Sequence, residues 1–193
     1  MILVLSSSLH PESRSRILAR GCLARLESLD RSAELFDLAT TPLPPCDGAT
    51  AYGSPEVRSL SGKIESADAI LIASPVYNYD VNAALKNAVE LTGKSWTGKI
   101  VGLMLAAGGQ GSYMSAMGLA NSLMLDFRCL IVPRFIYAVG EAFVDGEIAD
   151  PVIRGRIDQL VDDTLTLTDA LVTGTTAGDF LGPPAENALT PRR

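Results

Sequence analysis

Along most of the chain, short runs of hydrophobic residues alternate with longer segments in which apolar residues recur every three or four positions. The short runs predict strands, and two of them, residues 69–74 and 100–106, are apolar almost throughout, as is typical of strands covered on both faces. The longer segments predict amphipathic helices. The predicted strands are residues 2–6, 33–37, 69–74, 100–106 and 129–138, and the predicted helices lie near residues 15–28, 55–66, 82–92, 113–127 and 151–171.

This alternation of strands and helices predicts an α/β domain with a parallel sheet. Right-handed β-α-β crossovers connect parallel strands, and five strands at this spacing fit a doubly wound sheet of order 2-1-3-4-5. Such a sheet binds ligands at the carboxyl ends of its strands, where the strand order reverses beside the first strand. We expect the domain to span residues 1–172. Residues 173–193 are rich in Gly, Pro, Thr and Ala and lack periodicity, so we expect a flexible tail there.

The loop after the first strand carries hydroxyl groups and leads directly into a predicted helix. Ser6, Ser7 and Ser8 end the strand, and Ser13 and Ser15 stand near the start of the helix. Unpaired N–H groups at a helix N-terminus, together with these hydroxyls, can bind a phosphate. An ordinary helix cap at Ser13 or Ser15 explains the same residues equally well.

Two further loops follow the third and fourth predicted strands. Residues 74–80 combine the rigid Pro75 with Tyr77 and Asn78, which can place backbone against a flat heterocycle, and Asp80 or Asn82 is the expected cap of the next helix. Residues 108–111 contain three glycines, so their N–H groups are open to a ligand. Each loop alone is equally explained as an ordinary turn or a flexible connection. Because the first, third and fourth strands are neighbours in the predicted order, all three loops should meet at one sheet edge, which favours a shared ligand site.

The composition argues against several classes of binding partner. Sixteen basic and 22 acidic residues give a net charge of −6, which argues against a nucleic-acid groove. No apolar run reaches membrane-spanning length and no basic segment precedes the first strand, so we expect no membrane partner and a cytoplasmic location. Cys22, Cys46 and Cys129 are widely spaced, as expected of free thiols in a reducing compartment. His10 is the single histidine, which excludes a two-histidine metal site, and we expect no metal.

Several functions that the same architecture hosts lack their motifs here. The first strand ends in serines, where a response regulator needs clustered aspartates. The chain contains neither the Gly-x-x-x-x-Gly-Lys-Ser/Thr loop of a nucleoside triphosphatase nor the Gly-x-Ser-x-Gly element of a serine hydrolase. Gly109 and Gly111 follow the fourth strand and lack the third glycine of a dinucleotide-binding loop.

Two segments resemble the NADPH-dependent FMN reductase family of flavodoxin-like proteins, which includes chromate, quinone and azo-dye reductases. The segment from Ser7-Ser8-Leu9-His10 to Leu18-Ala19 matches, in register, the family pattern Gly-Ser-Leu-Arg-x-x-Ser-x-Asn-x-x-Leu-Ala. Residues 75–90 match a second pattern, Pro-x-Tyr-Asn-x-x-x-Pro-x-x-Leu-Lys-Asn-Ala-hydrophobic-Asp/Glu, and the glycine loop occupies the third flavin-contacting position of the family. The resemblance covers roughly the first 140 residues.

The resemblance implies a flavodoxin-like three-layer fold, FMN as cofactor and NADPH or NADH as cosubstrate. The enzyme would transfer a hydride from NAD(P)H to the flavin and then reduce a small-molecule acceptor, namely free flavin, a quinone, an azo compound or a metal oxyanion. The flavin performs this chemistry, so no catalytic side chain is expected. The family also implies a homodimer or homotetramer. The implied cofactor-binding residues are Ser8, His10, Ser13, Arg14, Ser15, Pro75, Val76, Tyr77, Asn78, Gly108, Gly109, Gln110, Gly111 and Ser112.

The chain departs from the family pattern at positions that bear on the site. His10 replaces an arginine that faces the phosphate, Ser15 replaces an asparagine, and Asn82 replaces the proline that begins the third helix. These changes concern how the phosphate is held and how the flavin loop is shaped. A flavodoxin-type electron carrier without NAD(P)H activity is the alternative function, and a regulatory or structural relative without flavin is a third. The long loop from Ser8 to Ser15 and an aromatic content of 6% favour the reductase over the carrier.

Overall fold

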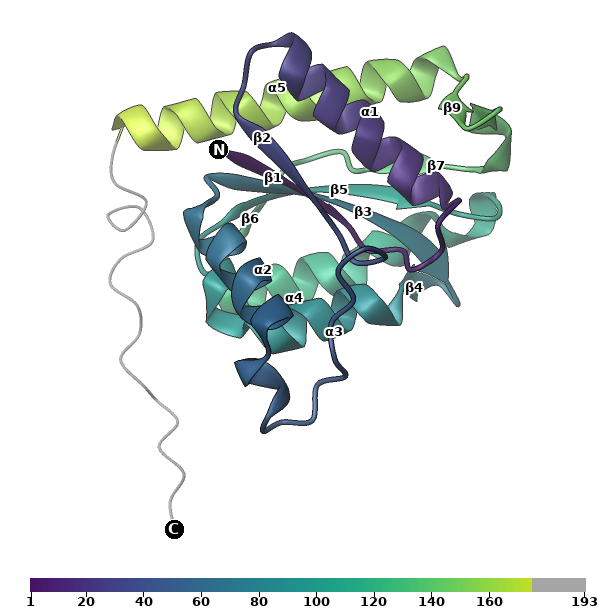
Figure 1. Ribbon diagram of the computed structural model, residues 1–193. Coiled ribbons are helices and arrows are strands. Elements are labelled where there is room, and N and C mark those ends of the chain that lie inside the picture. Colours follow the sequence, from purple (N-terminus) through teal and green to yellow (C-terminus); the bar gives the residue numbers. More distant parts are fainter. Residues whose placement is uncertain (175–193) are drawn as a thin grey trace.

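A twisted parallel sheet separates two layers of helices in the computed structural model, which describes residues 1–174 (Figure 1). The main parallel strands are β1 (Ile2–Ser6), β2 (Ala33–Asp37), β3 (Ala69–Tyr77) and β5 (Ile100–Ala106). Two short strands, β6 (Leu130–Ile131) and β7 (Ile136–Ala138), share the fifth position because both pair with β5. The predicted strand order 2-1-3-4-5 is confirmed, with β5 as the fourth strand of that order and β6 and β7 together as the fifth.

The sheet contains seven strands rather than the predicted five. The strand predicted over residues 129–138 is interrupted between β6 and β7, because Pro133 has no N–H to donate and Arg134 adopts a left-handed φ of 60°. The strand predicted over residues 69–74 continues to Tyr77 and turns back into β4 (Asp80–Val81), which pairs with it in antiparallel fashion. Pro75, Val76 and Tyr77, which we predicted in a loop, therefore belong to β3, and Asp80 of the same predicted loop belongs to β4.

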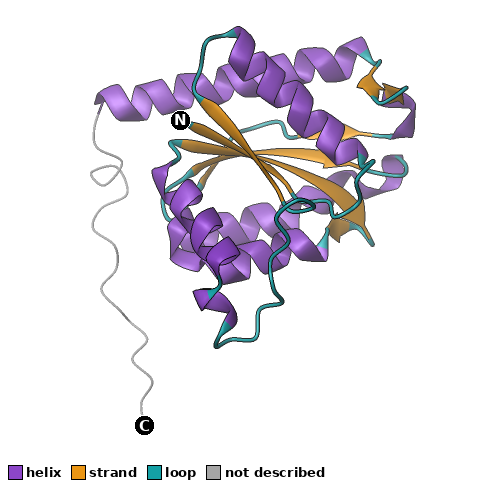
Figure 2. Cartoon of the chain, viewed as in Figure 1, coloured by secondary structure: helices purple, strands orange, loops and turns teal. Residues whose placement is uncertain are grey.

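Helices α1 (Arg14–Ser28) and α5 (Pro151–Gly174) cover one face of the sheet (Figure 2). The opposite face is covered by α2 (Pro55–Ser66), α3 (Ala83–Thr92) and α4 (Met117–Phe127). The helix predicted over residues 113–127 is two elements, because the 3-10 helix η3 (Gln110–Ala116) precedes α4. The shorter described elements are η1 (Ala51–Gly53), η2 (Gly93–Trp96), η4 (Gly140–Ala142) and the hairpin of β8 (Phe143–Val144) and β9 (Glu147–Ile148).

Helix α5 extends two residues past the domain boundary that we predicted at residue 172, and the rest of the predicted tail lies outside the described residues. Among the helices of residues 1–174, none has both the length and the apolar character needed to cross a membrane.

Successive side chains of the strands enter two separate cores. In β1, Ile2 and Val4 pack toward α1 and α5, whereas Leu3 and Leu5 pack toward α2, α3 and α4. This is the two-residue periodicity of a strand that is covered on both faces. Both cores are therefore built on the same strands, and the sheet holds the strand ends in fixed positions relative to one another.

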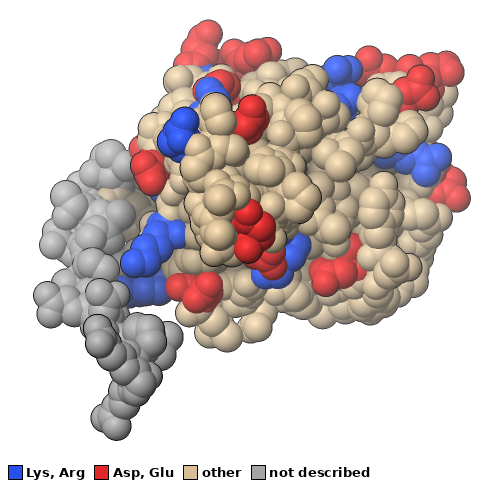
Figure 3. Space-filling model, turned by 60° about the horizontal axis from the view of Figure 1, so that its bottom comes forward, with Lys and Arg blue, Asp and Glu red and all other residues tan. Residues whose placement is uncertain are grey.

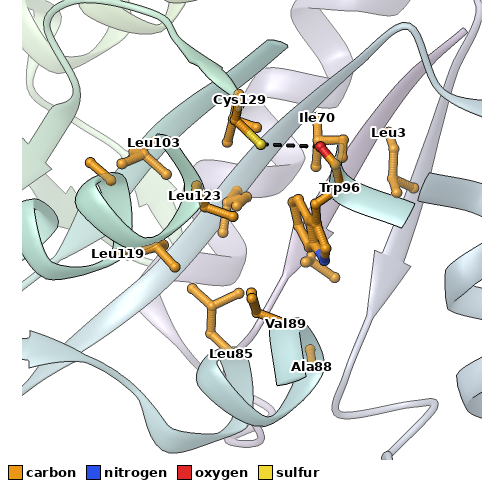
Figure 4. Packing of buried hydrophobic residues seen from close by; sticks show 14 of the residues in the cluster. Leu3, Ile70, Leu85, Ala88, Val89, Trp96, Leu103, Leu119, Leu123 and Cys129 are labelled. Atoms are coloured by element: carbon orange, nitrogen blue, oxygen red, sulfur yellow. Dashed lines mark hydrogen bonds between the residues drawn. The ribbon is translucent and has the colours of Figure 1, made fainter. Parts of the chain in front are cut away.

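The core under α3 and α4 contains the only tryptophan of the chain (Figure 4). Trp96 is fully buried, and its ring N–H donates to the Thr92 hydroxyl over 2.7 Å. The Cys129 thiol donates to the Trp96 carbonyl over 3.1 Å. These bonds satisfy polar groups inside an apolar cluster, where an unpaired polar group would be destabilising.

Candidate functional site

The register of the parallel strands brings three segments to one edge of the sheet. Ser6 at the end of β1 lies level with Ala73 of β3, and Pro75 of β3 lies level with Ala106 at the end of β5. The segments that follow β1, β3 and β5 therefore leave the sheet side by side, on the side where β4 and the start of α1 lie in Figure 1. This arrangement agrees with the convergence expected from the strand order.

The serines of the first loop are buried. Ser7, Ser8, Ser13 and Ser15 are each at most 9% exposed. Ser13 occupies the N-cap position of α1, but its hydroxyl makes no cap hydrogen bond and lies 2.7 Å from the Ser15 hydroxyl instead. The interpretation of Ser13 as an ordinary side-chain cap is therefore wrong.

The start of α1 keeps unpaired backbone donors. Within residues 1–174, the N–H groups of Leu9, Arg14 and Ser15 have no hydrogen-bond acceptor. A helix N-terminus carries a partial positive charge, and free N–H groups beside hydroxyls are the usual surroundings of a bound phosphate. The loop thus has the donors that an anion requires.

The two cationic candidates of this loop have different surroundings. His10 is exposed, and its Nδ1 accepts the N–H of Glu12 over 3.1 Å, which leaves Nε2 without a partner in the described chain. Arg14 is also exposed, and its guanidinium packs on Gly140, where a Cβ would lie 3.1 Å from Nη1. The side chain of Arg14 therefore reaches toward the segment that follows β7.

A third basic residue, Arg16, holds the loop against the end of β2. It was not among the predicted site residues. Arg16 is 7% exposed, and its Nε lies 2.6 Å from Oδ2 of Asp37 at the end of β2. Its Nη2 donates to the other carboxylate oxygen over 3.0 Å, and its Nη1 donates to the carbonyl of Pro11. This ion pair, with one charge-assisted hydrogen bond from Nη2, ties the loop to β2.

Asn82 connects the first loop to the β3 segment through one buried side chain. Its amide NH₂ donates to the Ser7 carbonyl over 2.8 Å, and its amide oxygen accepts from the hydroxyls of Ser7 (2.8 Å) and Ser74 (3.2 Å). The same oxygen accepts the N–H of Leu85, so Asn82, and not Asp80, caps α3. Sequence reasoning identified the cap but missed the connection to Ser7.

The turn between β3 and β4 places two tyrosines at the site. Asn78 and Tyr79 both have positive φ, 51° and 66°, and join the pairs Val76–Val81 and Tyr77–Asp80 in a two-residue hairpin. Tyr77 and Tyr79 are more than half exposed, and Asn78 is exposed as well. The turn therefore presents aromatic surface and backbone next to the loop that follows β5.

The glycine loop after β5 exposes its backbone. A Cβ placed on Gly108, Gly109 or Gly111 would meet nothing within 4 Å, and none of the three has positive φ. These glycines therefore matter because they carry no side chain that would cover the backbone, and not because the backbone needs an unusual conformation. The buried Tyr137 of β7 holds the loop, because its hydroxyl donates to the Gly109 carbonyl. The remaining predicted residues of this loop, Gln110 and Ser112, lie in η3.

The titratable groups of the described residues do not form a metal-binding cluster. Within residues 1–174, no three His, Cys, Asp or Glu side chains are grouped closely enough to hold a metal ion. Burial raises the pKa of the Cys22 and Cys129 thiols to about 12, so both stay protonated at neutral pH. The site therefore consists of hydrogen-bond donors, open backbone and aromatic surface.

Comparison with known proteins gives one consistent result. A family model described as NADPH-dependent FMN reductase matches residues 1–144. The chain is 25% identical to an NADPH azoreductase of Bacillus sp. (strain OY1-2), over 82% of this chain and 89% of the relative. It is 31% identical to the FMN-dependent NADH:quinone oxidoreductase of Bordetella petrii, over 83% of this chain and 94% of that protein. The flavoenzyme FerB of Paracoccus denitrificans has the same fold, with a TM-score of 0.68 at 24% identity over 86% of this chain and 97% of FerB.

Proposed function

Because the chain belongs to the NADPH-dependent FMN reductase family of flavodoxin-like proteins, we propose that the segments after β1, β3 and β5 together hold FMN. The protein is accordingly an FMN-dependent NAD(P)H oxidoreductase. One observation carries the assignment of the site. Unpaired donors at the start of α1 lie on the same sheet edge as open backbone at the glycine loop, which matches a ligand with an anionic end and a flat polar end.

The start of α1 would hold the phosphate of FMN. The hydroxyls of Ser8, Ser13 and Ser15 and the free N–H groups of Arg14 and Ser15 supply neutral donors. Nε2 of His10 and the guanidinium of Arg14 are the nearby groups that can add a donor or a charge. The Arg16–Asp37 pair keeps the loop in place, so the phosphate meets donors that are already positioned.

The strand ends at β3 and β5 would hold the isoalloxazine ring. Pro75, Val76, Tyr77 and Asn78 offer one backbone edge, and residues 108–112 offer the other. Because no side chain fills the space above the glycines, ring atoms can approach their N–H groups closely. Amide dipoles fixed there stabilise negative charge that develops on the ring.

When bound, FMN accepts a hydride from NAD(P)H and passes the electrons to a second acceptor. The chain itself binds and orients the ring and stabilises its charge, and we propose no catalytic acid, base or nucleophile among the site residues. The acceptor we propose is a small molecule, a quinone or an azo compound before free flavin or a metal oxyanion. A family relative named as a quinone oxidoreductase and another named as an azoreductase support that order.

We also propose that the protein forms a homodimer or homotetramer and works in the cytoplasm. Met114 and Leu125 on η3 and α4 are 50% and 77% exposed, and Met117 and Met124 add to this apolar surface. The face formed by α2, α3 and α4 is mostly uncharged, with acidic and basic side chains in small separate groups (Figure 3). The free thiols of Cys22, Cys46 and Cys129 suit a reducing compartment.

An anaerobic titration tests the function. Purified protein reconstituted with FMN should lose its yellow absorbance when NADPH or NADH is added, and a quinone or azo dye should restore it. Protein that binds FMN but is not bleached by either nucleotide would be an electron carrier instead. Protein that leaves the fluorescence of added FMN unquenched would contradict both functions.

A further inference from the structure

A small polar cavity of about 160 Å³ lies between η3, the segment that separates β6 from β7, and α5. Its polar lining consists of Arg134, Arg156, Gln159 and Asp163, and Tyr113, Phe135 and Leu160 complete the wall. Pockets that enclose drug-sized ligands have volumes above about 300 Å³. This cavity is therefore suited to one polar group of a larger ligand.

The two arginines of this cavity leave their charge available. Arg134 and Arg156 are both exposed, and within residues 1–174 neither guanidinium has an ion-pair or hydrogen-bond partner. Asp163 is the only acidic group of the lining, so the cavity keeps a net positive charge. Two planar guanidinium groups match the oxygens of a phosphate monoester better than those of a neutral group.

Arg134 is held at the cavity by an unfavourable backbone conformation. This residue follows Pro133 in the interruption between β6 and β7, and its φ of 60° is uncommon for a residue with a side chain. Such conformations are retained where the surrounding structure imposes them, and they concentrate at ligand sites. The interruption takes Arg134 out of the sheet ladder and leaves its side chain at the cavity.

Aromatic contacts join the cavity to the proposed flavin site. The Tyr113 ring, which forms part of the cavity wall, lies 5.0 Å from the Phe135 ring and 5.4 Å from the Tyr137 ring. Tyr137 in turn donates its hydroxyl hydrogen bond to the Gly109 carbonyl. Tyr113 is 47% exposed, so a planar base can stack on it while a phosphate occupies the cavity.

We propose that this cavity binds the 2′-phosphate of NADPH, with the adenine against Tyr113, and that the enzyme therefore prefers NADPH to NADH. The proposal rests on the NAD(P)H oxidoreductase function and names the group that selects the nucleotide. Asp163 opposes the phosphate electrostatically, so its charge sets the strength of the preference.

Binding of adenosine 2′,5′-bisphosphate to the FMN-loaded protein, measured by calorimetry, tests the cavity without turnover. Adenosine 5′-monophosphate and inorganic phosphate are the comparison ligands. We expect the bisphosphate to bind best, the double variant Arg134→Gln/Arg156→Gln to weaken it about tenfold or more, and Asp163→Asn to tighten it. Arg20→Gln, which removes an exposed arginine of α1 outside this cavity, is the matched control and should change nothing.

Steady-state kinetics give the second readout. The double variant should raise KM for NADPH about tenfold and leave KM for NADH and the FMN content unchanged. Equal losses with both nucleotides, or a bisphosphate that binds no better than the monophosphate, would overturn the proposal. Inorganic phosphate binding as tightly as the bisphosphate would also overturn it, because the cavity would then be a free-anion site. If neither nucleotide bleaches the flavin, the enzyme function fails, and the calorimetry still decides whether the cavity recognises the 2′-phosphate.

Discussion

The side chain of Asn82 and residue Ser7 exchange two hydrogen bonds across 75 positions of the chain: the amide NH₂ donates to the Ser7 carbonyl, and the Ser7 hydroxyl donates to the amide oxygen, each over 2.8 Å. Both residues are buried. A proline, which the family pattern has at this position, offers neither a donor nor an acceptor in its side chain. The asparagine therefore links the phosphate loop to the start of α3 in a way specific to this chain.

Replacing Asn82 by alanine should destabilise the protein and weaken FMN binding together. The change removes the acceptor of the buried Ser7 hydroxyl and the donor to the Ser7 carbonyl, which should lower the free energy of unfolding by about 2–3 kcal/mol. The Ser74 hydroxyl keeps the Pro75 carbonyl as acceptor, and the Leu85 N–H keeps the backbone carbonyl of residue 82. Urea unfolding of the apoprotein and FMN fluorescence titration measure the two effects.

The control for this variant is Asn87→Ala. Asn87 also makes two hydrogen bonds to backbone, with Cys46 and Pro44, but it is not one of the proposed flavin residues. The Asn87→Ala variant should be less stable than the wild type and should keep the wild-type affinity for FMN. An Asn82→Ala protein with wild-type FMN affinity would show that Asn82 is a structural cap and nothing more.

Removing the paired hydroxyls of Ser13 and Ser15 should weaken FMN binding by roughly 2–4 kcal/mol, because each hydroxyl can donate to a charged phosphate oxygen. Riboflavin, which lacks the phosphate, should bind the double alanine variant and the wild type equally. Ser28→Ala, at the other end of α1, serves as the control. A double variant with unchanged FMN affinity would place the phosphate elsewhere.

Replacing His10 by arginine should tighten FMN binding by about five- to tenfold at low ionic strength. The arginine gives up the weak contact with the exposed Glu12 N–H and brings a permanent cation to the phosphate. The gain should shrink in added salt, because exposed charges are screened. Fluorescence titrations at two salt concentrations measure this, and equal affinities of variant and wild type at low salt would count against a phosphate beside residue 10.

Stability should fall between pH 9 and pH 12, because burial raises the pKa of the Cys22 thiol to about 12 from an ordinary 9.0. Below pH 9 the folded and unfolded chains both keep this proton. Between the two pKa values only the unfolded chain releases it, so unfolding becomes easier by roughly 1 kcal/mol for each pH unit.

Urea unfolding of wild type and Cys22→Ala at several pH values tests this slope. The variant should be less stable at pH 8 and should lose less stability as the pH rises. Ser28→Ala, which removes an exposed hydroxyl at the end of α1, should run parallel to the wild type. A Cys22→Ala slope equal to that of the wild type would contradict the prediction.

The hydrophobic pattern alone predicted most of the fold, because strands covered on both faces and helices packed on one face leave distinct periodicities. It did not predict the break at Pro133 and Arg134, since the apolar character continues on both sides of it. It also did not predict β4, because the turn residues Asn78 and Tyr79 lack the glycine that usually marks a two-residue hairpin.

For the candidate site, local motifs identified the loops but not the contacts that hold them. A few consecutive residues are enough to recognise each local motif, namely the serines, the Pro75–Asn78 segment and the glycines. The pair Arg16–Asp37 and the bonds of Asn82 join residues that are far apart in sequence, and a single sequence carries no signal for such partners. Position 82 was recognised as a candidate helix cap and as a departure from the family pattern, but no local pattern indicated its bonds with Ser7.

The interruption between β6 and β7 also affects whether the edge of the sheet can pair with a strand of another molecule. A continuous strand over residues 129–138 would give the sheet a long exposed edge with unpaired N–H and C=O groups, open to pairing with another chain. The edge instead consists of the two short strands β6 and β7, which are separated by a proline and by an arginine with a left-handed backbone conformation. A strand of another molecule can therefore pair with this edge over only a few residues. The same kink that positions Arg134 should therefore protect this edge against aggregation.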